Sequence, residues 1–181
     1  MNRDRPLRYQ CVAAMVLVLA ATAAGAHSAS DAYLTLDADT PSETGGAART
    51  VVHVQWDIAL RDLDFVLKLD DDGDGNITWA ELRKHQTAIA AYAMESLNVS
   101  SDHGACTIRP KRQMVDNHAD GTYAALFFDI ACVGAARRIT LDYRLFFAID
   151  PSHRGILVFH SGPNTATALL SPENARIELR P

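Results

Sequence analysis

Cysteine, basic charge and long apolar runs are all scarce in this sequence, and each shortage argues against a class of protein. Only three of the 181 residues are cysteine, and Lys+Arg number 17 against 22 Asp+Glu. After residue 26, no apolar run approaches the roughly 20 residues that a transmembrane helix needs. No low-complexity tract or internal repeat stands out, so disordered and solenoid proteins are not indicated. The remaining composition, with 48% hydrophobic residues, is sufficient for one hydrophobic core.

Residues 1–26 are predicted to be a secretory signal. Three arginines precede an apolar run at 11–24, and Ala24-Gly25-Ala26 supplies the small residues that a signal peptidase accepts. An uncleaved membrane anchor is the alternative, although the run is short for a membrane span. We therefore expect cleavage near Ala26, His27 as the first residue of the exported protein, and a single periplasmic or secreted domain over residues 27–181.

Cleavage makes the protein more acidic. The predicted signal carries three arginines and one aspartate, so residues 27–181 hold 14 basic and 21 acidic residues, a net charge of −7. Nucleic-acid binding requires a basic face, so we expect no nucleic acid as a partner. An acidic exported domain instead attracts cations. The sequence identifies no small-molecule substrate.

The two cysteines that remain after cleavage, Cys106 and Cys132, are predicted to form a disulfide. An even number of cysteines in an oxidising compartment favours pairing. Two strand-like segments, 107–114 and 122–131, flank a turn cluster, and a hairpin centred on Ala119 places the cysteines directly opposite each other. Closing such a loop stabilises a fold by about 3–4 kcal/mol on the chain-entropy model. Two unlinked thiols are the alternative, and no second Cys or His pair at ligand spacing indicates zinc.

The hydrophobic pattern changes between strand and helix periods along the chain. Val52, Val54, Trp56 and Ile58 alternate with more polar residues, as in a half-buried strand. Apolar spacing becomes helical over about 60–69 and again from 78 to about Leu97. The predicted strands lie at 33–36, 50–58, 107–114, 122–131, 139–145, 157–159, 166–170 and 175–179. We expect an α+β, mainly β fold: an antiparallel β-sandwich-like domain with a helix–loop–helix insert at about 60–97.

The insert contains the most specific motif of the chain, an acidic loop at 70–81. Its sequence, DDDGDGNITWAE, matches the D-x-D-x-D-G-x-I-x-x-x-E pattern of an EF-hand calcium loop over its full length. Oxygens at alternate positions, closed by a bidentate glutamate, form the shell that Ca²⁺ takes. The predicted ligands are Asp70, Asp72, Asp74, Asn76 through its backbone carbonyl, Thr78 through a water, and Glu81.

The metal and its role are also predicted from this loop. Gly75 permits the positive φ that wraps the chain around an ion, and Ile77 is expected to point into the core. Such a shell is too large for octahedral Mg²⁺, and softer metals lack thiolate or imidazole ligands here. A solvated acidic turn that binds nothing is the alternative. Regulatory EF-hands usually come in pairs and no second loop is found, so we expect a structural ion rather than a sensor.

The sequence around the loop resembles a known family. WDIALRDLD at 56–64, ITWAEL at 77–82, DGTY at 120–123 and DPSHRG at 150–155 resemble the exported N-terminal region of HupE/UreJ-type membrane proteins. These are hydrogenase and urease accessory proteins linked to nickel, and they continue into several transmembrane helices. The resemblance implies an exported calcium-holding domain, acting beside a membrane-protein partner or left by a truncated reading frame.

Transition-metal handling is the second functional hypothesis. An amino-terminal His27 can chelate copper through its amine and imidazole, although an ordinary residue at the cleavage point is the alternative. On this hypothesis the protein is an accessory module for nickel or copper with a membrane partner. The histidines considered for completing such a site are His53, His118, His153 and His160.

No enzyme motif is found, and we expect no enzymatic activity. Ser161-Gly162 lacks the strand–elbow–helix context of a catalytic nucleophile. His153-Arg154 after Asp150-Pro151 indicates either an anion site or a turn whose side chains bind backbone groups, and we favour the turn.

Overall fold

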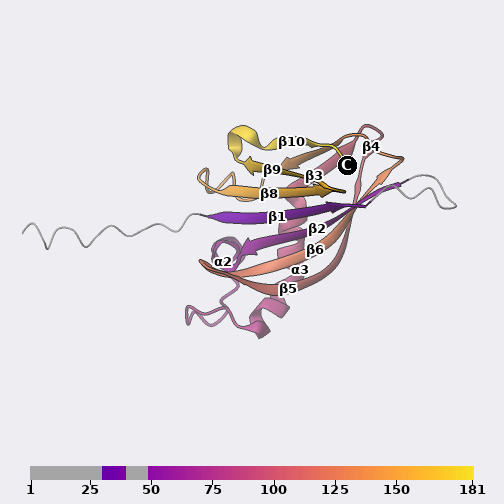
Figure 1. Cartoon of the computed structure of the whole chain (residues 1–181). Helices are drawn as coiled ribbons and strands as arrows, with labels where there is room; N and C mark the ends of the chain where they lie inside the picture. The colour runs from indigo at the N-terminus through magenta and orange to yellow at the C-terminus, as the bar shows by residue number, and fades with distance from the viewer. Residues whose placement is uncertain (1–29, 40–48) are drawn as a thin grey trace, which may run out of the picture.

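The computed structural model describes residues 30–39 and 49–181 (Figure 1). The predicted signal at 1–26 and the predicted amino-terminal His27 lie outside these described residues. Ten strands, two α-helices and one 3-10 helix, Pro172–Asn174, make up the described part. Within it, no helix combines the length and the apolar character needed to cross a membrane.

Six strands form the larger, mixed sheet. Every neighbouring pair in it is antiparallel except β1 and β8, which run parallel. In order across the sheet, the strands are β5 (Thr107–His118), β6 (Gly121–Val133), β2 (Arg49–Ala59), β1 (Asp31–Ala38), β8 (Arg154–Ser161) and β9 (Asn164–Leu170).

Four strands form a smaller antiparallel sheet that shares one core with the larger sheet. In order, they are β10 (Arg176–Leu179), β7 (Ile139–Tyr143), β3 (Leu97–Ser101) and β4 (Gly104–Ala105). The buried core cluster includes Leu34 and Trp56 from the larger sheet and Leu141 and Tyr143 from the smaller one. The Trp56 and Tyr143 rings meet inside it, with centroids 5.6 Å apart. The interior therefore lies between the two sheets.

Both helices come from the segment between β2 and β3. Helix α2 (Leu60–Leu67) begins at the residue after β2 ends, and α3 (Trp79–Glu95) follows the acidic loop. Leu63 of α2 and Leu82 and Ile89 of α3 are buried in the same core. Figure 1 shows α2 and the loop at one end of the larger sheet, near the turn between β5 and β6.

The α+β, mainly β fold class is confirmed, while two details differ from the prediction. The second helix ends at Glu95 rather than near Leu97. Leu97 instead opens β3, where Leu97 and Val99 are buried at strand spacing and pair with β7. The parallel pairing of β1 with β8 also departs from the expected all-antiparallel arrangement.

The predicted disulfide between Cys106 and Cys132 is present, with Cα atoms 4.4 Å apart. The hairpin is not centred on Ala119, because His118 pairs with Gly121 and leaves a two-residue turn. A bulge between Pro110 and Arg112 shifts the register by one residue. The predicted pairing is therefore correct next to the cysteines and one residue out near the turn.

We predict that the disulfide contributes about 3 kcal/mol to the free energy of unfolding, because it closes a loop in the unfolded chain. Replacing both cysteines with alanine should lower the urea midpoint accordingly. Wild-type protein in dithiothreitol should fall toward the same midpoint, whereas the double variant should not respond to the reductant. Equal midpoints for oxidised wild type and the double variant would contradict this account.

Candidate metal centre

The acidic loop is fixed at both ends by side chains that cap its flanking helices. At the end of α2, the Asp64 carboxylate accepts hydrogen bonds from the N–H groups of Leu69 and Asp70 at 2.7 and 3.0 Å. At the start of α3, Thr78 and Glu81 form a reciprocal capping box. Leu69 is fully buried, so the loop starts from a fixed point in the core.

Backbone N–H groups orient the carboxylates inside the loop. Asp70 Oδ1 accepts from the N–H of Gly73 and Asp70 Oδ2 from that of Gly75, both at 2.8 Å. Asp74 accepts from the N–H of Asn76 at 2.7 Å. Gly75 has a φ of +85°, which L side chains rarely adopt, so glycine is required where the chain turns back on itself.

Three of the predicted ligands converge. One oxygen each from Asp70, Asp72 and Asp74 can be chosen so that all three lie within 4.8 Å of one another. The N–H of Asp74 lowers the pKa of Asp72, but the charge of Asp74, desolvation and the charge of Glu81 outweigh this bond and raise that pKa overall. The cluster therefore concentrates negative charge that a cation would relieve.

The remaining predicted ligands are placed differently. Glu81 is not in this three-oxygen group; its Oε2 accepts from the backbone and side chain of Thr78 at 2.8 and 2.7 Å, and its Oε1 accepts from the N–H of Asp71. These hydrogen bonds, that of the Thr78 hydroxyl first, lower the pKa of Glu81. Asn76, the seventh of the twelve loop residues, donates its backbone N–H to Asp74. Ile77 packs against the core as expected.

Asp71 differs from its acidic neighbours because it faces α3. Its carboxylate contacts Lys84 Nζ at 2.8 Å and His85 Nε2 at 3.1 Å. Hydrogen bonds from Lys84 and then from His85 lower the pKa of Asp71. Asp71 is the second residue of the loop, and the EF-hand pattern assigns no ligand role to this position. In the structure its contacts with Lys84 and His85 hold the loop against α3.

The turn between β5 and β6 lies beside the loop. Asp70, Gly75 and Asn76 line one side of a hollow of about 440 Å³, and residues 120–123 line another. Arg61 of α2 donates to the carbonyl oxygen of Asp120 at 3.3 Å, which connects the helix to this turn. The sequence gives no indication that the two segments are neighbours, because their proximity depends on strand order.

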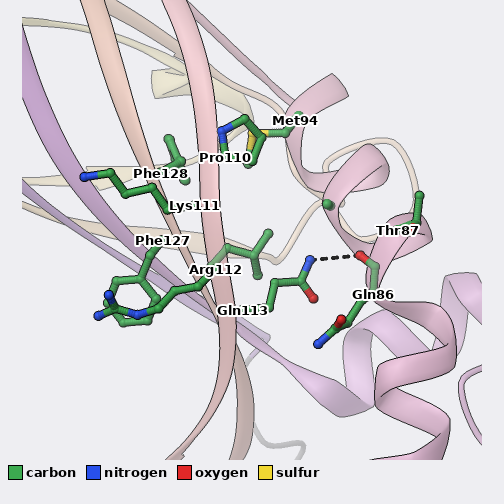
Figure 2. Close-up of a pocket in the computed structure, with 11 residues that line it drawn as sticks. Gln86, Thr87, Met94, Pro110, Lys111, Arg112, Gln113, Phe127 and Phe128 are labelled. Atoms are coloured by element: carbon green, nitrogen blue, oxygen red, sulfur yellow. Dashed lines mark hydrogen bonds between the residues drawn. The ribbon is translucent and has the colours of Figure 1, made fainter.

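A second hollow, of about 340 Å³, lies between α3 and β5 (Figure 2). Gln113 reaches toward α3, where its Nε2 donates to the carbonyl oxygen of Gln86 at 2.8 Å. The other residues that line this hollow are Thr87, Ala90, Met94, Pro110, Lys111, Arg112, Leu126, Phe127 and Phe128. This lining contains no carboxylate, imidazole or thiol, so in the described part of the chain the hollow offers neither these metal ligands nor a carboxylate–histidine pair.

The four histidines considered for a transition-metal site do not gather at one place. His53 of β2 contacts Asp129 and Asp39, and His160 of β8 contacts Thr165. His118 of β5 lies near Asp57 and Asp116, two residues that the sequence did not single out. Asp57 belongs to β2, whereas Asp116 and His118 belong to β5, and β6 lies between these two strands. The approach of Asp57 to the other two residues therefore cannot be inferred from sequence spacing.

His153 is buried in a hydrogen-bonded chain rather than exposed for anion binding. Its Nδ1 lies 2.7 Å from Ser30 Oγ, which donates to Asp62 Oδ2, and its Nε2 lies 2.7 Å from the Tyr143 hydroxyl. Since Ser30 donates its hydrogen to Asp62, it accepts from Nδ1–H of His153. Burial lowers the pKa of His153 to about 4, so the ring is neutral at pH 7 and its Nε2 accepts from the Tyr143 hydroxyl. Arg154 Nη1 donates to the carbonyl oxygens of Pro151 and His153. These contacts match the turn that the sequence favoured.

Comparison with known proteins adds no relationship: no family model matches the chain and no curated protein matches its sequence. The resemblance to HupE/UreJ-type proteins therefore stays a prediction.

We predict that His153 makes the fold less stable as the pH falls below about 6.5. Burial, reinforced by the charge of Arg154 and opposed by that of Asp150, lowers the pKa of His153 to about 4. Between these pH values the unfolded chain binds a proton that the folded chain does not, so the free energy of unfolding decreases by up to about 3 kcal/mol toward pH 4.

Urea unfolding of wild type, His153→Gln and His160→Gln across pH 4.5–7.5 measures this contribution. His153→Gln should flatten the slope whatever its effect on absolute stability, and His160→Gln should retain it. Parallel pH profiles for wild type and His153→Gln would refute the assignment.

Proposed function

We propose that the loop at 70–81 binds one calcium ion, and that the ion acts as a structural clamp. The observation that carries this proposal is the convergence of carboxylate oxygens from Asp70, Asp72 and Asp74 within 4.8 Å, at the positions of an EF-hand loop. Backbone N–H groups already orient these carboxylates. Because the loop is preorganised, little conformational freedom is lost on binding.

Glu81 completes the shell in this proposal. It closes an EF-hand loop from the first turn of the outgoing helix, where α3 places it. To bind the ion, the Glu81 carboxylate gives up the hydrogen bonds that it accepts from Thr78 and Asp71. Losing this part of the helix cap costs about 1 kcal/mol. The attraction between this carboxylate, with its one negative charge, and a divalent cation outweighs that cost.

The anchoring of the loop supports a clamp rather than a switch. Leu69 precedes the first ligand and is fully buried, Ile77 packs against the core, and Leu82 follows the last ligand and is buried. A sensor EF-hand opens a helix pair to expose a groove. Here both helices belong to one core shared with two sheets, so an ion in the loop tightens the α2–α3 connection without freeing either helix.

We further propose an exported, non-catalytic domain with a membrane-protein partner. The Cys106–Cys132 disulfide supports an oxidising compartment such as the periplasm or the exterior. The partner is supported by the sequence resemblance alone.

Isothermal titration of chelator-treated protein should show one calcium ion per chain. Glu81→Gln should weaken binding by at least about 100-fold, because it removes the negative charge and one of the two ligand oxygens, while glutamine still completes a capping box. In wild type, calcium at 100 times its Kd should add about 2.7 kcal/mol to the free energy of unfolding.

The matched control is Asp71→Asn, which alters an acidic residue of the same loop that contacts Lys84 and His85. This variant should bind calcium within about threefold of wild type, since its side chain is not a predicted ligand. Unaltered calcium affinity in Glu81→Gln, or no binding by wild type, would overturn the proposal.

A further inference from the structure

The outer face of the larger sheet carries a second group of side chains able to bind a metal, and none of its residues belongs to the acidic loop. Asp57 of β2 and Asp116 and His118 of β5 each offer one ligand atom, and these atoms lie within 4.8 Å of one another. Strand β6 runs between β2 and β5 and places the small side chain of Ala125 opposite Asp57. One imidazole and two carboxylates therefore face a common point from two strands.

Neighbouring side chains hold two members of this group in place. Gln55 Nε2 donates to both oxygens of Asp57 at 3.0 Å. The His118 ring stacks on Tyr33 with centroids 4.8 Å apart and contacts Tyr123 with centroids 4.2 Å apart. Outer residues that hold ligand side chains in position are a general feature of protein metal sites. Asp116 is exposed, so the group is open to solvent on one side.

One ring nitrogen of the group makes no hydrogen bond within the described part of the chain. His118 Nε2 is buried and lies 3.4 Å from Asp57 Oδ2, close enough for an ion pair, but it forms no hydrogen bond with that oxygen or with any other described residue. A buried polar atom without a partner costs about 1–3 kcal/mol. A metal ion between the imidazole and the carboxylates removes this cost and the repulsion between Asp57 and Asp116.

His53, on the same face of the sheet, provides an internal comparison. Its Nδ1 contacts Asp129 at 2.6 Å and its Nε2 contacts Asp39 at 3.2 Å, so both ring nitrogens have partners. Lys111 also lies 2.7 Å from Asp129 and already supplies a positive charge. Lys111 supplies a positive charge beside His53, whereas among the described residues no lysine or arginine forms an ion pair with Asp57 or Asp116.

We propose that Asp57, Asp116 and His118 bind a divalent transition-metal ion of the Zn²⁺ class. A single imidazole with two carboxylates is a mixed nitrogen–oxygen set, which suits such ions better than Ca²⁺ or Mg²⁺. Three protein ligands leave a coordination position for water on the exposed side. This site is independent of the calcium loop and does not involve His27.

Zinc titration of tag-free protein, saturated with calcium, tests the proposal. Wild type should bind one Zn²⁺ per chain at this site, and His118→Gln and Asp116→Asn should each weaken that binding by at least about tenfold. Asp116 is exposed, so its replacement should preserve the fold. The His118 Nε2 nitrogen resonance should move on zinc addition while that of His160 stays in place.

The controls separate this site from the other candidates. His53→Gln and His160→Gln should retain wild-type zinc affinity, because neither residue belongs to the group. Zinc binding that survives in both His118→Gln and Asp116→Asn, or that is lost in His27→Ala alone, overturns the proposal. An unmoved His118 resonance at saturating zinc does the same.

Discussion

Strand β2 is hydrogen-bonded on both sides, to β1 and to β6. Successive side chains of β2 point alternately into the core and to the outer face of the sheet. Trp56 and Ile58 enter the core, while His53, Gln55 and Asp57 lie on the opposite face. A slip of one residue would exchange these faces, so the register of β2 fixes that of its neighbours. The same strand continues directly into α2, and the position of the acidic loop depends on it.

The distribution of charge supports the two cation sites that we propose. Lysines contact Asp71, which lies in the loop, and Asp129, which pairs with His53 further along the sheet. Within the loop, Asp70 and Asp74 receive backbone N–H donors, which orient a carboxylate without neutralising its charge. Carboxylates that no lysine contacts therefore remain in both proposed sites, where a bound cation would reduce their mutual repulsion.

Local patterns predicted the local features well. The alternation in β2, the start of α3 at the capping box and the convergence of three loop aspartates follow from residues close together in sequence. The approach of Asp116 and His118 to Asp57 depends on strand order across β6, which periodicity does not contain. The bulge near Lys111 was missed for a related reason, since one extra residue changes register without changing composition.

Hydrogen–deuterium exchange of the loop, with calcium and with chelator, tests the clamp most directly. If calcium bridges Asp70, Asp72 and Asp74, the Gly75 and Asn76 amides that donate to these carboxylates should exchange at least about tenfold more slowly with calcium. Amides in β2 should already be protected in both conditions. Unchanged exchange across 70–81 at saturating calcium would contradict the central claim that the ion holds this loop.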